Sequence, residues 1–516
     1  MAAARGGDRD VAALRHVCLR IHRVERAAGR FVATLAAGAW LFGAAHATPT
    51  AAPSRPAPQG LDVERVTAEK FSGDFEQLLE RRLIRVHVPY SRTLYFNDKG
   101  TQRGITADLM HEFERHLNRK YARRLGKRPL TVVLIPTTRD EMLDDVAQGL
   151  GDIAAGNLSI TEARLQKVDF ARLPGGPTND EVIAVGPQSP PLASLDDLAG
   201  RTIHVRPAAS YFATLRELNA RFAREGRPAM KLAPLPDALE DEDKLEMLSA
   251  GLLPLVVIDD WKGRLWSQLL PHIKVRDDLA LKKDVPIGWA IRKGSPQLRA
   301  EIEAFLSHTR RTTSFDTRTR LALGQLRKLR NNTAEADRKR FQQTIALFEK
   351  YGARYGFDPV MLAALGYQES RLRQDARSPM GAVGIMQVMP ATGASLKVGD
   401  ITKAEPNIHA GTKYMSQLLT QYFPDATFSE ADRPLFAVAS YNAGPGRISQ
   451  MRKEAARRGL DPDKWFNHVE LVTAEKIGIE TTSYVRNVFK YYVAYTLMRE
   501  AQSEQKKARD ALRTKS

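Results

Sequence analysis

The sequence predicts two folded domains in series, an α/β domain followed by an all-helical domain. Three observations predict this organisation. The chain has 516 residues, more than one hydrophobic core usually supports. Strand-like and helix-like segments alternate from about residue 82 to residue 310. From about residue 333 the strand signals stop, and helical segments broken by Gly and Pro follow.

Short apolar runs predict the strands of the first domain, which we place at residues 81–315. In chain order these strands are 83–89, 130–135, 152–155, 181–185, 202–205 and 255–258. Amphipathic spacing predicts helices at 106–117 and 139–149. Because helices alternate with strands, we expect mainly parallel strands. The acidic run at 240–243 is interpreted as a solvated loop rather than a calcium site.

The second domain, placed at residues 330–500, has a well-marked helix start. Asp358 can cap a helix, and Pro359 suits its first position. The apolar residues that follow predict one buried helix face, with Glu369 near the C-terminal end. Residues 501–516 form a polar, basic tail that we expect to fray.

The N-terminus predicts a secretory signal peptide over residues 1–47. Seven arginines precede an apolar run at 31–45, which ends in the small-x-small pattern Ala45-His46-Ala47. An uncleaved membrane anchor is the alternative, although the run is short for the ~20 residues that a spanning helix needs. The only cysteine, Cys18, lies in this segment, so the mature chain has no disulfide or thiolate chemistry. Residues 48–80 are expected to be a linker, rich in Pro and Ala at 48–60.

The charge limits the choice of partners. Removal of residues 1–47 takes away seven arginines and three acidic residues, which lowers the net charge from +18 to +14. A basic chain suits a polyanion such as nucleic acid, anionic lipid or cell wall. Zinc-finger spacing and a basic helix with heptads are both missing from the sequence, so we predict no nucleic-acid partner. We also predict no metal and no cofactor, since His and carboxylate residues do not cluster at ligand spacing.

Four segments of the second domain contain candidate catalytic residues. They are 368–370 (QES), 378–390 (SPMGAVGIMQVMP), 439–446 (ASYNAGPG) and 480–484 (ETTSY). Glu369 follows a strongly apolar helix, and partial burial of a carboxyl favours its neutral form. A neutral carboxylic acid can protonate a glycosidic oxygen. The alternative is an ordinary surface glutamate at a helix end.

The neighbouring motif residues each have a functional and a structural interpretation. Gly381 and Gly384 permit a tight turn, or belong to a plain surface loop. Gln387 can hydrogen-bond a sugar or the nearby backbone, and Met389 can contact a sugar face or pack in the core. Tyr441 can hold Glu369 or the substrate, or serve as a buried structural tyrosine. Each residue alone is a weak indication.

Together these segments resemble the soluble-lytic-transglycosylase family of peptidoglycan lyases, over about residues 340–500. The glutamate followed by serine, the G-x-x-G-x-M-Q segment and the A-x-Y-N-A-G segment occur in the family's order. The resemblance implies a goose-lysozyme-like helical fold and a catalytic acid/base at Glu369. The substrate-binding residues that we predict are Ser378, Gln387, Met389, Tyr441, Asn442, Glu480 and Tyr484. For Glu480, a structural role at a helix N-terminus is the preferred interpretation.

The resemblance also implies a reaction. Glu369 would protonate the bond between N-acetylmuramic acid and N-acetylglucosamine and then deprotonate the muramoyl C6 hydroxyl, which leaves a 1,6-anhydro end. Ordinary glycosidases instead use two carboxylates. Two alternatives stay open: a goose-type muramidase, which would release reducing ends, and a ligand sensor with an inactive catalytic domain.

The first domain resembles the family 3 solute-binding proteins of amino-acid transporters, over about residues 82–310. The segment from Ser159 to Arg164, followed by Val-Asp-Phe at 168–170, carries the likeness. It implies a periplasmic-binding-protein-like fold, with Arg164 on a ligand carboxylate, Ser159 beside it and Asp259 on a ligand amine. The alternative for Arg164 is a surface ion pair. Residues 208–210 depart from the family, because only Ser210 keeps a hydroxyl where Gly-Thr-Thr is usual.

The order of the two domains is similar to that of a membrane-bound class of lytic transglycosylases. We therefore expect the first domain to bind an amino acid or a muropeptide and to regulate the second. The expected partners are peptidoglycan strands, this ligand and a membrane surface. The expected location is the periplasm, peripheral on the outer membrane, where the positive charge favours anionic surfaces.

Overall fold

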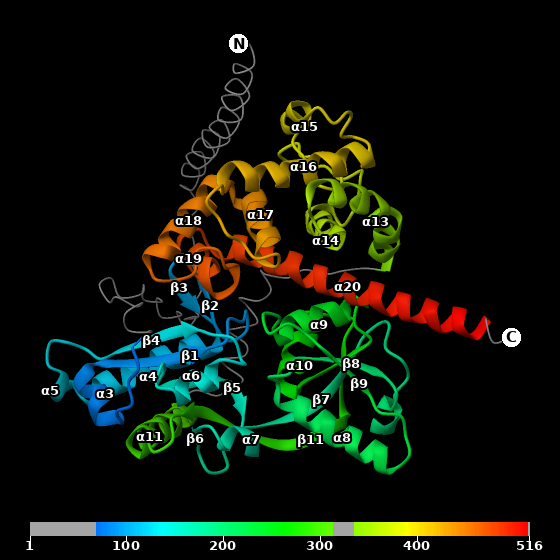
Figure 1. The fold of residues 1–516 in the computed structure, drawn as a ribbon. Helices are drawn as coiled ribbons and strands as arrows, with labels where there is room; N and C mark the ends of the chain where they lie inside the picture. Colours follow the sequence, from blue (N-terminus) through cyan, green and yellow to red (C-terminus); the bar gives the residue numbers. More distant parts are fainter. Residues whose placement is uncertain (1–68, 313–334, 514–516) are drawn as a thin grey trace, which may run out of the picture. The chain divides into compact units, whose positions relative to one another are not determined.

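The computed structural model describes residues 69–312 and 335–513; the predicted signal peptide and the segment at 48–60 lie outside them. A seven-stranded sheet organises the first domain (Figure 1). The strand order is β10-β7-β11-β5-β1-β4, with β6 paired to β11. The strands are β1 (Leu83–Val88), β4 (Thr131–Pro136), β5 (Ile153–Ser159), β6 (Asp169–Ala171), β7 (Thr178–Val185), β10 (Leu255–Asp259) and β11 (Lys274–Ile291).

The strand directions are mixed, so the expectation of mainly parallel strands is wrong. β1 runs parallel to β4 and β5. β11 runs antiparallel to β5, β6 and β7, and β7 runs antiparallel to β10. The long strand β11 was not predicted, because charged and half-exposed positions interrupt its apolar residues. Its pairing with both β7 and β5 connects the two lobes of the domain.

Figure 1 shows these lobes as a blue and cyan group around β1, β4 and β5 and a green group around β7, β8 and β9. The helices of this domain are α3 (Phe75–Arg81), α4 (Ile105–Lys120), α5 (Ala122–Leu125), α6 (Met142–Ala147), α7 (Glu162–Leu165), α8 (Ser210–Arg224), α9 (Asp241–Ser249), α10 (Asp260–Ser267) and α11 (Pro296–Thr312). Two small sheets pair β2 (Phe96–Asp98) with β3 (Thr101–Arg103), and β8 (Thr202–Val205) with β9 (Lys231–Pro234). Helix α3 begins inside the predicted linker, which is thus partly ordered, and it buries Phe75, Leu78 and Leu79.

The acidic run at 240–243 is not a solvated loop. Glu240 caps α9, and the next three acidic residues form its first turn, each at most 5% exposed. The carboxylates are buried because cations from other elements reach them. Arg139 and Arg206 pair with Glu240, and Arg92 pairs with Asp243. Isolated charges would not tolerate this burial, but paired ones do.

The second domain is built from helices, as predicted. They are α13 (Glu335–Tyr355), α14 (Pro359–Ser370), α15 (Pro390–Leu396), α16 (Ala404–Tyr422), α17 (Asp432–Ala443), α18 (Pro445–Arg457), α19 (Glu470–Lys476) and α20 (Ile479–Arg513), with a short π-helix (Trp465–Val469) before α19. Between residues 335 and 513, the strand-like contacts that the structure describes are two isolated bridges. They pair Val383 with Arg377 and with Val388.

Helix α14 begins and ends where the sequence indicates. The Asp358 carboxylate accepts hydrogen bonds from the backbone N–H groups of Val360, at 2.7 Å, and Met361, at 3.3 Å. All residues from 360 to 367 are buried, so the helix is surrounded by core rather than buried on one face. Arg371 adopts a left-handed conformation with φ of 57° and ends the helix. Glu369 therefore lies in the last turn, where α14 leaves the core.

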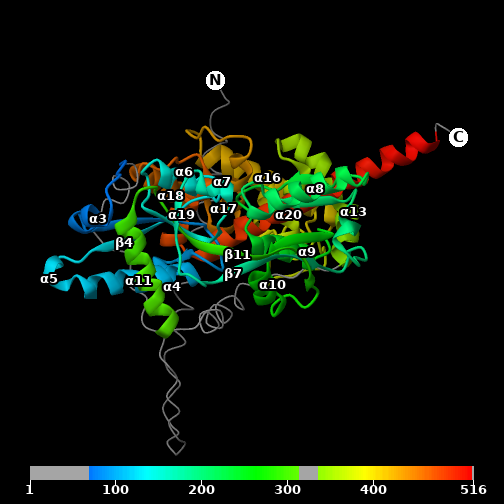
Figure 2. The same cartoon turned by 90° about the horizontal axis from the view of Figure 1, so that it is seen from below.

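Helix α20, red in Figures 1 and 2, belongs to both domains' cores. Val485 and Val488 pack in the core of the second domain, whereas Val493 and Ala494 pack with apolar residues of the first. The helix continues to Arg513, so residues 501–513 extend α20 in this structure, and their fraying stays a prediction. Of the helices within 69–312 and 335–513, none combines the length and apolar character that crossing a bilayer requires.

Candidate active site

Glu369 is the chemically unusual carboxyl of the second domain. Burial raises its pKa from 4.5 to about 7, against the opposing effect of a hydrogen bond from Tyr484. The apolar turn before it, with Leu365 fully buried, supplies the poorly solvating surroundings. At neutral pH a large fraction of Glu369 therefore carries a proton, which a general acid requires.

Two tyrosines from other helices lie close to Glu369. The Tyr484 hydroxyl, on α20, donates to Oε1 of Glu369. The Tyr441 hydroxyl, on α17, donates to the backbone oxygen of Met386 at 2.7 Å. Burial and the nearby charge of Glu369 raise the pKa of both phenols well above 10. Both phenols therefore remain neutral hydrogen-bond donors. The helices α14, α17 and α20 meet near the carboxyl of Glu369.

The segment 378–388 forms a tight loop. Oγ of Ser378 accepts a hydrogen bond from the backbone N–H of Ala382 at 2.9 Å. Gln387 has a left-handed φ of 45°, and its Nε2 donates to the backbone oxygen of Gly384 at 2.8 Å. These bonds support the structural interpretation of Ser378 and Gln387. Gly381 and Gly384 have φ of 89° and 76°, which agrees with the predicted turn.

Two polar residues hold this loop beside Glu369: Asn407, which the sequence analysis missed, and Ser370, which the QES segment contains without an assigned role. Asn407, on α16, is fully buried. Its Oδ1 accepts from the backbone N–H of Met386 at 2.8 Å, and its Nδ2 donates to the backbone oxygens of Val383, at 2.8 Å, and Ile401, at 3.0 Å. Ser370 donates to the backbone oxygen of Ile385 at 2.9 Å. The available signal for Asn407 was an asparagine next to an apolar residue, Ile408, in the part of the chain predicted to be helical.

Three predicted residues lie at exposed positions around the site. Met389 is 36% exposed where α15 begins. Asn442 is exposed in the last turn of α17, and Glu480 is exposed in the first turn of α20. The position of Glu480 fits its preferred interpretation, because a negative charge stabilises a helix N-terminus. The hydrogen bond described for Glu369 involves none of the three.

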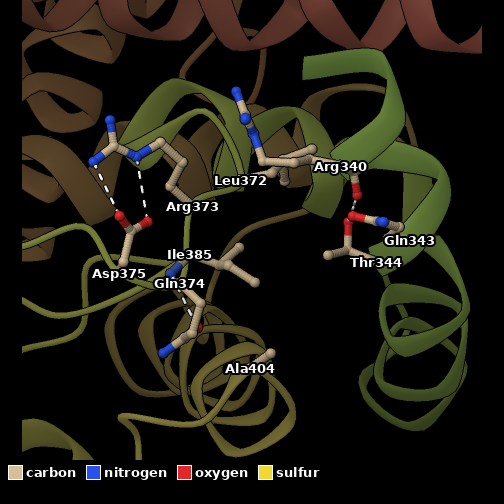
Figure 3. A pocket seen from close by; sticks show the side chains of 9 residues that line it. All are labelled: Arg340, Gln343, Thr344, Leu372, Arg373, Gln374, Asp375, Ile385 and Ala404. Carbon is tan, nitrogen blue, oxygen red and sulfur yellow. Dashed lines mark hydrogen bonds and ion pairs between the residues drawn. The ribbon is translucent and has the colours of Figure 1, made fainter. Parts of the chain in front are cut away.

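A separate hollow of about 620 Å³ lies between α13 and the chain that follows α14 (Figure 3). Ile385 and Leu372 form part of its wall, and Arg373 pairs with Asp375 at 3.3 Å. The hollow adjoins the loop held by Ser370. It does not contain Glu369 or any predicted substrate-binding residue.

The structure brings together Ser159 and Arg164 of the first domain. The Arg164 guanidinium donates to the backbone oxygens of Ser159, at 2.8 Å, and Ala208, at 3.0 Å. The alternative of a surface ion pair is thus wrong for Arg164. Burial lowers its pKa to about 10, so it stays positive at neutral pH. Asp259 is buried, 3.4 Å from the ammonium of Lys262, and its charge acts on Arg164.

Glu181 is a further polar residue here that the sequence analysis missed. Ser210 donates to its Oε1 at 2.8 Å and Thr214 to its Oε2 at 2.6 Å. Burial raises the pKa of Glu181. Ser210 also lies 3.3 Å from the Ser159 hydroxyl. The retained hydroxyl at 210 therefore joins β5, β7 and α8 at one polar site.

Two family models match the two domains. Residues 84–320 match the bacterial extracellular solute-binding proteins of family 3, and residues 346–463 match the transglycosylase SLT domain. The second match includes Glu369, the loop and Tyr441, and it ends before Tyr484. The chain therefore belongs to the proteins that join a family 3 solute-binding domain to an SLT domain, as predicted.

Over most of its length the chain is similar to proteins named membrane-bound lytic murein transglycosylase F. It is 27% identical to that of Desulfosudis oleivorans over 419 residues, 77% of this chain and 86% of the other. It is 26% identical to that of Pseudomonas fluorescens over 448 residues, 83% of this chain and 88% of the other. Among solved structures, an amino acid transporter substrate-binding protein from Streptococcus pneumoniae bound to L-arginine matches with a TM-score of 0.39 and 17% identity, covering 49% of this chain and 98% of the other.

Proposed function

We propose that this protein is a peptidoglycan lytic transglycosylase and that Glu369 is its single acid/base. The observation that carries the proposal is the raised pKa of Glu369, about 7, at the end of a buried helix. Among the described residues, burial and Tyr484 are the influences that shift this pKa, and neither is a second carboxylate. The SLT domain and the relatives named lytic murein transglycosylases support the same activity.

The proposed reaction needs one group that gives and then takes a proton. Glu369 donates its proton to the glycosidic oxygen as the bond to the muramoyl C1 breaks. Tyr484 stabilises the resulting carboxylate through its hydrogen bond. Glu369 then accepts the proton of the muramoyl C6 hydroxyl as the C6 oxygen bonds to C1. The product is a 1,6-anhydro end, no water is consumed, and the carboxyl returns to its protonated state.

The proposed substrate-binding residues fall into three groups by their position near Glu369. Tyr441 on α17 and Tyr484 on α20 lie near the carboxyl of Glu369. Ser378 and Gln387 shape the loop, so we propose that they act mainly by presenting its backbone to the sugar. The remaining candidates, at the exposed positions, are Met389, Asn442 and Glu480.

Mass spectrometry of soluble products from purified peptidoglycan tests the proposal. The comparison is wild type, Glu369→Gln and, as a matched control, Glu430→Gln in the exposed stretch before α17. We expect anhydromuropeptides from wild type and the control, and none from Glu369→Gln. Products with reducing ends would indicate a goose-type muramidase instead. Equal products from Glu369→Gln would exclude this residue as the acid, and no products from any protein would favour the sensor interpretation.

We propose that the first domain binds an amino acid or a muropeptide through Ser159, Arg164 and Asp259, and regulates the second domain. A guanidinium that is already aligned by two backbone oxygens suits a ligand carboxylate. Calorimetry on the mature chain with amino acids and stem peptides tests this, with Arg164→Gln as the deficient variant. Heat of binding that persists in Arg164→Gln, or none with wild type, would exclude the site.

We also propose a periplasmic location with peripheral attachment to the outer membrane. The support is the predicted signal peptide, the names of the relatives and a mature net charge of +14. Fractionation of cells, followed by washing of the outer membrane with high salt, tests the attachment. Release by salt is expected, whereas retention would indicate a firmer anchor.

A further inference from the structure

Helix α20 contacts both the catalytic glutamate and the first domain. Tyr484 donates its hydrogen bond to Glu369. Six residues later, the ammonium of Lys490 forms an ion pair with Glu246 of α9 and donates to Oδ1 of Asn487 at 3.1 Å. Six residues correspond to about 1.7 helical turns, so Tyr484 and Lys490 leave α20 on different faces.

The ion pair of Lys490 and Glu246 is almost fully buried. Each side chain is 1% exposed. Arg92 also reaches this carboxylate and donates to the two oxygens of Glu246 at 2.9 and 3.0 Å. Burial raises the pKa of Glu246, but Arg92 and Lys490 outweigh this effect and hold the pKa below its ordinary value. Glu246 therefore carries its charge, and loss of Lys490 would remove one of its two cations.

Other contacts attach the same part of α20 to the first domain. Arg486 donates to the backbone oxygen of Ala238 at 2.8 Å, and its guanidinium lies 4.4 Å from the ring centre of Tyr90. The hydroxyl of Thr482 lies 3.3 Å from that of Tyr90. Tyr484 thus sits on a stretch of helix that the first domain holds before and after it. Lys490 supplies the buried charge of this attachment.

We propose that Lys490 is a positioning residue for peptidoglycan cleavage: its ion pair with Glu246 fixes α20 so that Tyr484 keeps its hydrogen bond to Glu369. The inference rests on the proposed function and adds a role for the first domain. This domain supports the donor that stabilises the catalytic carboxylate. A Lys490 that merely stabilised the fold would leave the protonation of Glu369 unchanged.

The test uses the mature full-length protein with Lys490→Met, Lys490→Arg and Tyr484→Phe. Methionine keeps the length of the side chain and removes its charge. The matched control is Lys453→Met, an exposed lysine on α18. Two quantities are measured: the rate of fragment release from purified peptidoglycan between about pH 5 and pH 9, and the pKa of Glu369. Carbon-13 NMR titration of labelled glutamate gives this pKa, with Glu369→Gln to assign the signal.

We expect Lys490→Met to reduce the rate about tenfold at neutral pH. We also expect the pKa of Glu369 to rise by at least about half a pH unit, because the bond from Tyr484 that lowers it is weakened. Lys490→Arg should restore both quantities, and Lys453→Met should leave both at wild-type values. In the Tyr484→Phe background, Lys490→Met should cause no further rise, because the bond is already gone.

An unchanged pKa of Glu369 in Lys490→Met would overturn the proposal, as would an equal further rise in the Tyr484→Phe background. If circular dichroism shows that Lys490→Met does not fold, Glu246→Gln is judged by the same criteria. It removes the charge with little change in volume. A wild type that releases no fragments overturns the proposed function instead, and the NMR titration still decides the role of Lys490.

Discussion

The hydroxyl of Tyr484 donates a hydrogen bond to the carboxyl of Glu369, and the two residues lie on different helices, α20 and α14. This bond works against the burial that raises the pKa of Glu369. In the proposed reaction, burial favours the protonated form of Glu369 before cleavage, and the hydrogen bond from Tyr484 favours the carboxylate that forms during it. The pKa of about 7 is the balance of the two effects.

The activity of the wild type should fall as the pH rises through about 7. A general acid works in its protonated form, and Glu369 loses its proton above its pKa, which burial raises to about 7. With an ordinary pKa of 4.5 the fall would come more than two pH units lower. Initial rates of fragment release at saturating peptidoglycan, from about pH 4 to pH 9, give the pH profile, and the position of its descending limb is the measured quantity. A limb near pH 4.5 would contradict the burial of the carboxyl.

Tyr484→Phe should move that limb to higher pH and lower the maximal rate. The lost hydrogen bond no longer stabilises the carboxylate, so the pKa of Glu369 rises. We expect a rate loss of about 10- to 100-fold, at or below the lower end of the ~100- to 10,000-fold that a general acid itself contributes, because Tyr484 assists the proton donor and does not itself donate the proton. The control is Tyr492→Phe on the same helix, since the charge that acts on Tyr492 is Asp358 rather than Glu369. Identical pH profiles for Tyr484→Phe and wild type would contradict the role of this bond.

Gly384→Ala should destabilise the second domain more than Gly381→Ala. Both glycines have a positive φ, which costs an alanine about 1 kcal/mol. A β-carbon at 384 would also lie 2.6 Å from the side-chain nitrogens of Asn407 and Gln374, whereas the space around 381 is open. We expect a loss of about 2–4 kcal/mol for Gly384→Ala. Urea unfolding measures both, and equal losses would contradict the close approach at 384.

Asn407→Ala should loosen the loop beside Glu369. The substitution leaves the backbone N–H of Met386 without its partner in a buried place, whereas the oxygens of Val383 and Ile401 keep hydrogen bonds from the Val388 N–H and from Gln374. An unsatisfied buried N–H costs about 1–3 kcal/mol, so we expect a loss of about 1–3 kcal/mol in the free energy of unfolding. The exposed Asn442→Ala serves as the control for stability. Similar unfolding curves for the two variants would show that water replaces the amide.

The helix that carries Glu369 was predictable because its signals are local. Asp358 and Pro359 mark its start, and the apolar run after them marks its burial. The proposed proton-donating role of Glu369 rests on that run together with the family resemblance, because the run alone also allows an ordinary surface glutamate. The partners of Glu369 were harder to predict, because Tyr484 is 115 residues away and the sequence does not state which tyrosine reaches the carboxyl.

Two of the failures, the missed strand β11 and the acidic run at 240–243, share a physical cause: the partners that make these segments stable lie far away in the sequence. Strand β11 contains many charged residues, so its sequence shows no apolar run that would predict a strand. Its pairing with β5 and β7 is what makes it a strand. The acidic residues of α9 look solvated in sequence because their cations come from distant parts of the chain. Arg92 lies about 150 residues before Glu246, and Lys490 lies 244 residues after it. Local sequence patterns therefore do not predict ion pairs between residues that lie so far apart in the chain.

Asp241→Asn should destabilise the protein strongly, which distinguishes a buried acidic helix from a solvated loop. The Asp241 carboxylate lies 2.9 Å from the Arg206 guanidinium, 2.9 Å from the ammonium of Lys244 and 2.5 Å from that of Lys262. Burial alone would raise its pKa, but these cations hold it well below the ordinary value. Neutralisation leaves Lys244, which is fully buried, without its counter-ion. Loss of one partner in such a cluster costs about 3–5 kcal/mol.

Urea unfolding of Asp241→Asn and of the control Glu162→Gln, an exposed residue of α7, measures the difference. A solvated loop would give both variants a change of no more than about 0.5 kcal/mol. Acid should act in the same direction as the substitution. Since the folded state lowers the pKa of Asp241, its stabilising effect is present above the unfolded value of about 3.9 and disappears as the pH falls through the lower folded value. Asp241→Asn should therefore lose less stability than wild type on acidification, and a parallel loss would contradict the ion cluster.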